Sequence, residues 1–148
     1  MEQAATATLI VEGTPEFGRS TEAALALLRA YDPERAGLVT QHIRRLTGLG
    51  RRDAWRLGRA TLYDRNWQAL TRRVEYAWVD RRRRQCFVTP AVWQVSLDDA
   101  VALRRYASVL VHEAAHLYLD TDDEDRCNAE MHAALQNLTP GSDRLAAF

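Results

Sequence analysis

The chain has no lysine, and all twenty of its basic residues are arginine. It therefore has no side-chain amine for Schiff-base chemistry, which excludes enzymes that work through a lysine imine. Its two cysteines, Cys86 and Cys127, are too few for a disulfide framework. Glycine and proline are also scarce, at seven and four residues. These absences exclude a disulfide-stapled miniprotein, a collagen-like chain and a chain of flexible linkers.

Long apolar runs are missing as well. No stretch approaches the roughly 18 consecutive apolar residues that a membrane-spanning helix needs. The first residues lack the basic and apolar regions of a secretory signal. We therefore expect a cytoplasmic protein without a membrane segment. A length of 148 residues with 47% hydrophobic and 27% charged residues suits one globular domain, and residues 1–20 are expected to contain a short strand or a frayed end.

The formal net charge of zero conceals an uneven distribution of charge. Residues 1–40 carry three arginines against six acids, residues 41–84 thirteen against four, and residues 85–148 four against ten. Such a basic middle segment indicates either pairing with the acidic parts of the chain or contact with an anionic partner such as a nucleic acid. Its densest part is a run of four: Arg81, Arg82, Arg83 and Arg84.

Apolar periodicity and capping residues predict a mainly helical α+β domain. Helices are expected at residues 21–30, 32–46, 99–119 and 123–138, and in the Arg-rich segment 51–73. Two β-rich runs at 74–79 and 85–89 predict a hairpin, and residues 92–97 alternate as a third, edge strand. The expected fold is a single domain in which this small antiparallel sheet packs on helix 99–119.

The most specific motif is His112-Glu113-Ala114-Ala115-His116, an HExxH pattern inside helix 99–119. Residues four apart lie one turn above each other, so both imidazoles leave the same face and can bind one zinc ion. Glu113 is offset by about 100° around the helix, where it can take a proton from a water activated by the metal. The flanking residues are apolar, and buried imidazoles are costly without a partner such as a metal.

A catalytic zinc site usually takes a third protein ligand. Glu130 is the preferred candidate, because small and apolar neighbours in helix 123–138 predict that it faces inward toward the two histidines. Asp122, Asp123 and Cys127 are the alternatives. Most acids between residues 120 and 125 are explained by a solvated corner and by the start of the last helix.

The segment 92–135 resembles the active-site core of the zincin metallopeptidases, closest to the small gluzincin type. The resemblance implies that His112, His116 and Glu130 bind zinc, and that Glu113 is the general base. It also implies that strand 92–97 binds extended substrate by backbone pairing. It covers about a third of the chain, and HExxH is its specific part.

The sequence therefore predicts a zinc-dependent hydrolase that cleaves peptide bonds in a peptide or protein substrate. Tyr63, Tyr76 and Tyr106 are candidates for stabilising the oxyanion, and the sequence does not select among them. The alternative is a zincin-like binding module with structural zinc, which acts through the Arg-rich face on nucleic acid or another partner. His42, on the second predicted helix, is expected to be a partly buried or surface residue and not a ligand.

Overall fold

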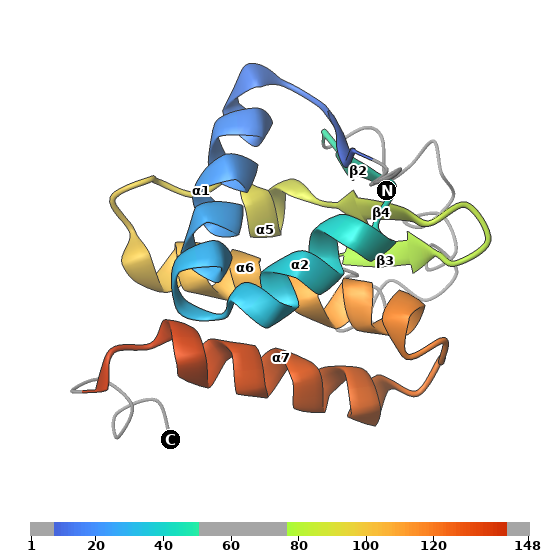
Figure 1. Ribbon diagram of the computed structural model, residues 1–148. Helices are drawn as coiled ribbons and strands as arrows, with labels where there is room; N and C mark the ends of the chain where they lie inside the picture. Colours follow the sequence, from blue (N-terminus) through green and yellow to red (C-terminus); the bar gives the residue numbers. More distant parts are fainter. Residues whose placement is uncertain (1–7, 51–76, 142–148) are drawn as a thin grey trace, which may run out of the picture.

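The structure is a computed structural model that describes residues 8–50 and 77–141 of the chain (Figure 1). These residues form a small α+β domain in which helices predominate, as the sequence predicts. The predicted segment 51–73 and residues 74–76 lie outside the described part. The elements are β1 (Ile10–Glu12), α1 (Pro15–Tyr31), α2 (Pro33–His42), β2 (Arg45–Gly48), β3 (Ala77–Asp80), β4 (Gln85–Val88), α5 (Pro90–Trp93), α6 (Ala100–Tyr118) and α7 (Glu124–Leu138).

The sheet is mixed, with the strand order β1-β2-β4-β3 among the described strands. β3 and β4 form the predicted hairpin, and their antiparallel register pairs Trp78 with Phe87 and Val79 with Cys86. β1, β2 and β4 are parallel to one another. The prediction of a purely antiparallel sheet is therefore wrong, because α1 and α2 form a crossover that returns β2 beside β1 in the same direction.

Residues 92–97 do not form the predicted edge strand. Pro90 occupies the first position of the short helix α5, and no strand follows it before α6. Trp93 points inward, where its indole N–H donates a hydrogen bond to the Leu49 carbonyl at 3.0 Å. The pattern of this segment reflects burial of Val92 and Trp93 in one helical turn, and not strand pairing.

The first two helices differ from the prediction at their ends. α1 begins at Pro15, well before residue 21, because the Thr14 side chain accepts a hydrogen bond from the Phe17 N–H and caps the helix. α2 starts at Pro33 as predicted but ends at His42, short of residue 46. Residues 45–48 lie between β1 and β4 instead, so strand pairing overrides the helical periodicity there.

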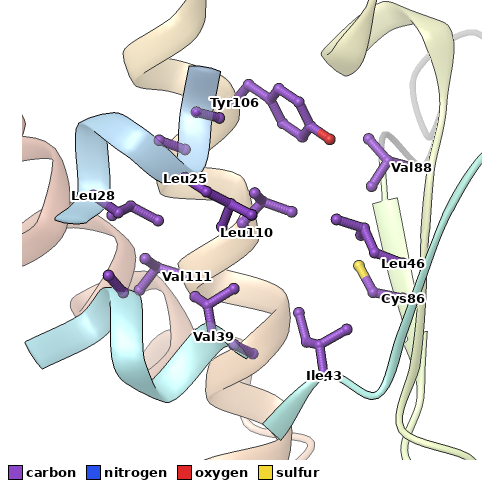
Figure 2. Packing of buried hydrophobic residues seen from close by; sticks show 14 of the residues in the cluster. Leu25, Leu28, Val39, Ile43, Leu46, Cys86, Val88, Tyr106, Leu110 and Val111 are labelled. Carbon is purple, nitrogen blue, oxygen red and sulfur yellow. The ribbon is translucent and has the colours of Figure 1, made fainter. Parts of the chain in front are cut away.

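The core lies between the sheet and the helices, and α6 runs through its centre (Figure 2). Tyr106, Leu110 and Val111 of α6 are fully buried. They meet Leu28 of α1 and residues of α2, β2 and β4, of which Figure 2 shows Val39, Leu46, Cys86 and Val88. α7 packs along the other side of α6 (Figure 1). The HExxH helix is therefore held on several sides, which makes it a rigid platform for the groups it carries.

Candidate metal centre

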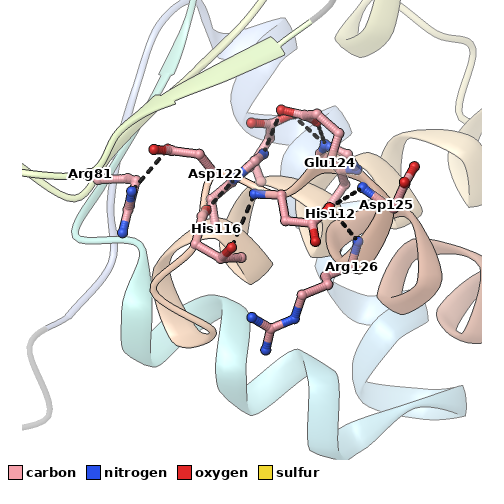
Figure 3. A network of polar contacts seen from close by, with 10 residues as sticks. Arg81, His112, His116, Asp122, Glu124, Asp125 and Arg126 are labelled. Carbon is pink, nitrogen blue, oxygen red and sulfur yellow. Dashed lines mark hydrogen bonds and ion pairs between the residues drawn. The ribbon is translucent and has the colours of Figure 1, made fainter.

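His112 and His116 project from the same face of α6, as predicted. Their ring centroids are 5.2 Å apart with an interplanar angle of 74°, and both side chains are largely buried. Figure 3 shows the two imidazoles beside the first turn of α7. One helix thus supplies two nitrogen donors to a single point.

The turn that follows α6 orients the second imidazole. Asp120 adopts a left-handed conformation, with φ of 50°. Its N–H donates to the Leu117 carbonyl at 3.2 Å, and the Thr121 N–H donates to the His116 carbonyl at 3.1 Å. This pair of hydrogen bonds is a Schellman motif, and aspartate is one of the few residues other than glycine that accepts the conformation it requires. The turn ends α6 and sends the chain back toward the two histidines.

The same turn fixes the tautomer of His116. Its Nδ1 lies 2.8 Å from the Thr121 carbonyl oxygen. A carbonyl can only accept a hydrogen bond, so Nδ1 carries the proton and a neutral His116 presents a bare lone pair at Nε2. A backbone carbonyl behind a metal-binding histidine is the usual means of orienting its ring.

Glu124, the first residue of α7, completes a three-sided cluster with the two histidines. Its Oε1 lies 2.8 Å from His112 Nε2, and its Oε2 lies 3.3 Å from His116 Nε2. One ligand atom from each residue can be chosen so that all three lie within 4.8 Å of one another. A carboxylate oxygen facing a bare Nε2 needs a cation between them, either a proton or a metal ion. The set of two imidazoles and one carboxylate fits zinc, which takes three such ligands in catalytic sites.

Glu130, the predicted third ligand, is not brought to this cluster. It is partly buried on another face of α7, where Oε1 accepts a hydrogen bond from the Tyr118 hydroxyl at 2.5 Å. Arg35 of α2 also contacts it, with Nε 3.4 Å from Oε1. Burial, followed by the contact with Glu130, raises the pKa of Tyr118. Glu130 thus faces inward as expected, but its partners are Tyr118 and Arg35.

The alternative ligands are also accounted for. Asp123 caps α7 by accepting hydrogen bonds from the N–H groups of Asp125 and Arg126. Asp122 pairs with Arg81 at 2.9 Å. Cys127 is fully buried, and this burial raises the pKa of its thiol to about 11, with Glu124 as the next cause.

Glu113 lies at the edge of the candidate centre. Its Oε2 is 4.0 Å from His112 Nε2, and the residue is only 7% exposed. This placement agrees with the predicted offset around the helix: the carboxylate is next to the histidines but does not occupy the position of Glu124. It can therefore serve a proton-transfer role beside a metal without being one of its ligands.

A cavity of about 400 Å³ opens onto the cluster. Hairpin residues make one wall and the α6–α7 residues make the other. Its lining consists of Ala77, Trp78, Val79, Arg81, His112, Glu113, His116, Asp122 and Glu124. β3 is thus the strand beside the candidate centre, at the end of the described sheet, where the sequence predicts residues 92–97.

Arg81 also lines this cavity, a position that the sequence does not predict for a member of the basic run. Its guanidinium contacts the carboxylates of Asp120 and Asp122, and these hydrogen bonds raise the pKa of Arg81. Of the candidate tyrosines, Tyr106 is fully buried and its hydroxyl is 2.6 Å from the Thr21 hydroxyl, away from the cavity. Tyr63 and Tyr76 lie outside the described residues.

The basic run is largely engaged within the chain. Arg83 pairs with Asp80 at 2.8 Å, and Arg84 Nη1 lies 3.2 Å from His42 Nδ1. Together with the contacts of Arg81, this leaves Arg82 as the member whose guanidinium has no partner among the described residues. His42 is half-buried, as predicted, and burial followed by Arg84 lowers its pKa. Nucleic-acid binding through Arg81–Arg84 stays a prediction, and this internal pairing does not favour it.

Comparison with known proteins gives no further assignment. No family model, no curated protein and no solved structure matches the chain. Within residues 8–50 and 77–141, no helix has the length and apolarity required to cross a membrane.

Proposed function

We propose that this protein is a zinc-dependent hydrolase, and specifically a peptidase. The observation that carries the proposal is the cluster in which Glu124 lies within 2.8 Å and 3.3 Å of the Nε2 atoms of His112 and His116. Two imidazoles and a carboxylate are the protein ligands of many catalytic zinc sites, which keep a fourth position open for water or substrate. A cavity of about 400 Å³ at this cluster supports such an open position.

The other residues of the cavity have separate roles in the proposed reaction. When bound, zinc would supply the Lewis acidity that polarises a carbonyl group and makes a water acidic near neutral pH. Glu113 accepts the proton of the attacking water and passes it to the leaving amine. It lines the cavity, with its Oε2 4.0 Å from His112 Nε2, so it can reach a water held beside the cluster. The Thr121 carbonyl holds the His116 ring so that its Nε2 faces Glu124 and would be available to a bound zinc ion.

The proposed substrate is an extended peptide segment. β3 is at one end of the strand order in the described sheet, and it contributes Ala77, Trp78 and Val79 to the cavity wall. An extended chain can pair with a strand at this position by main-chain hydrogen bonds, while its side chains contact the apolar wall. A reducing, cytoplasmic setting is part of the proposal and agrees with the two free, buried cysteines, Cys86 and Cys127.

The metal half of the proposal is tested by zinc analysis of the purified chain. We expect one zinc per chain, and its loss in His116→Ala. The matched control is His132→Ala, because His132 is an exposed histidine on α7, away from the cluster. A chain without stoichiometric zinc, or equal zinc in both variants, would refute metal binding at this cluster.

The catalytic half is tested with Glu113→Gln and a library of unstructured peptides. The variant should keep its zinc and lose about 10²- to 10⁴-fold in the rate of peptide cleavage, the usual contribution of a general base. Glu34→Gln, which changes an exposed glutamate on α2, should cleave at the rate of the unaltered protein. If the unaltered protein holds zinc and cleaves nothing, the metal is structural and the alternative of a binding module is favoured.

A further inference from the structure

Arg81 connects two parts of the structure that are far apart in sequence. It is the first residue after β3, in the tip of the β3–β4 hairpin. One nitrogen of its guanidinium is 2.5 Å from Asp120 Oδ1, and another is 2.9 Å from Asp122 Oδ1. Both carboxylates belong to the turn between α6 and α7. Figure 3 shows the contact with Asp122 beside the histidine cluster.

The turn to which Arg81 is bound by these ion pairs is the turn that orients His116. Thr121 lies between the two aspartates, and its carbonyl oxygen accepts the hydrogen bond from His116 Nδ1 at 2.8 Å. Arg81 therefore holds both neighbours of the residue that sets the direction of the imidazole.

We propose that Arg81 is a positioning residue for the metal centre, and that it strengthens metal binding by fixing the 120–122 turn and, through Thr121, the ring of His116. This inference rests on the proposed metal site. It assigns to Arg81 a role that acts through other residues, without direct contact with the metal.

The turn needs such a restraint. The side chains of Asp120 and Asp122 are 91% and 87% exposed, so packing does not hold them. Asp120 also has the left-handed backbone conformation, which is less favourable for aspartate than for glycine. A planar guanidinium can bind two carboxylates at once in a fixed geometry, whereas a lysine ammonium acts as a point charge.

Electrostatics alone predicts that Arg81 weakens metal binding, which is the opposite of the positioning proposal. Arg81 is a cation in the wall of the cavity, so it repels a metal cation in the same cavity. Replacing it by glutamine removes this repulsion and also frees two carboxylates that attract the metal. Both changes would tighten metal binding. Metal binding can become weaker only if the His116 ring loses its orientation. The sign of the change in Kd therefore distinguishes a positioning role of Arg81 from the electrostatic effect of its charge.

The experiment measures the zinc Kd of the full chain and of Arg81→Gln by competition with a chromophoric chelator at low salt. We expect the Kd of Arg81→Gln to rise about three- to tenfold, at or below the lower end of the 10- to 100-fold range seen when a direct partner of a metal ligand is removed. Because exposed ion pairs are screened by salt, the two Kd values should converge at about 1 M salt. Arg83→Gln is the matched control, since Arg83 lies in the same hairpin tip and its ion pair among residues 8–50 and 77–141 is with Asp80.

The outcomes separate this inference from the proposed function. An unchanged or lower Kd in Arg81→Gln overturns the positioning role and leaves the metal site intact. Failure of the unaltered chain to bind zinc overturns both. If Arg81→Gln does not fold, Arg81→Lys carries the test, because it keeps the charge and loses the two-carboxylate grip. Weaker zinc binding by Arg81→Lys supports positioning, and equal binding refutes it. The absorption spectrum of the cobalt-loaded chain provides a second readout, since a change in the His116 geometry alters it and a change in fold stability alone does not.

Discussion

Comparing the same substitution at two glutamates of α7 gives the most direct test of the candidate centre. Glu124→Gln and Glu130→Gln are the same isosteric change, six residues apart on one helix. Glu124 lies against both histidines, whereas Glu130 contacts Tyr118 and Arg35. Six residues turn an α-helix through about 600°, so the two side chains leave faces about 120° apart. Only one of them can therefore be a ligand.

The expected changes in zinc affinity and in the free energy of unfolding follow from the contacts of each glutamate and from typical zinc-binding energies. A four-ligand zinc site contributes about 10–16 kcal/mol, or about 3 kcal/mol per ligand. Glu124→Gln should thus weaken zinc binding by about two orders of magnitude. Glu130→Gln should leave the zinc Kd within a factor of about two and lower the free energy of unfolding by about 1 kcal/mol, because Arg35 loses one of its two charged partners and keeps only Asp32 of that pair. Chelator competition measures the first quantity and urea unfolding the second. If Glu130→Gln loosens zinc and Glu124→Gln does not, the assignment of the third ligand is reversed.

Further predictions concern the buried core and the thiols. Tyr106→Phe should lower the free energy of unfolding by about 1–2 kcal/mol in urea, because the Thr21 hydroxyl is left buried without its partner, whereas Tyr31→Phe at an exposed site should have no effect. Gly48→Ala should lower the free energy of unfolding by about 1–3 kcal/mol, since a Cβ there would lie 2.3 Å from the Phe17 ring. Gly18→Ala, in open space within α1, should raise the melting temperature. Equal effects of the two substitutions on stability would contradict this packing. Burial raises the pKa of Cys86 and raises that of Cys127 to about 11, so both thiols should be neutral and resist alkylation at pH 8 until the chain unfolds. The stability that Cys127 contributes is present below its ordinary pKa of 9.0 and should be lost as the pH rises through about 11; rapid labelling of the native chain at pH 8 would contradict this.

The sequence predicted the parts of the structure that local patterns determine. The HExxH helix and the last helix begin and end within one residue of the expected positions, and so do the end of β3 and both ends of β4 in the hairpin. In each, the apolar period, capping aspartates or a polar tip between β-rich runs agrees with the tertiary environment. The common face of His112 and His116 followed from helical geometry alone.

The position of Glu124 beside the histidines could not be predicted in this way, because two explanations competed for the same acids. Glu124 stands in the first turn of α7, where an acid is already explained by the helix dipole. Glu130 has small neighbours and does face inward, but α2 brings Arg35 to it. The distinction depends on how tightly the chain reverses after α6. The signal in the sequence was Asp120, an aspartate that can take the left-handed conformation in place of glycine.

The helix that carries Glu124 is tied to the rest of the fold by residues outside the histidine cluster. Asn137, near the far end of α7, donates to Asp32 at 3.0 Å, and Arg35 links Asp32 to Glu130 in the middle of the helix. The main core lies around Tyr106 and Leu110 of α6, on the side of the sheet. These contacts fix the orientation of α7, so we expect the proposed ligand geometry to exist before an ion binds. Chelation should therefore leave the circular dichroism spectrum unchanged and lower stability only by the binding term, which is about 2.7 kcal/mol at free zinc of 100 times Kd. A chain that unfolded on chelation, as zinc fingers do, would show instead that the metal organises α6 and α7.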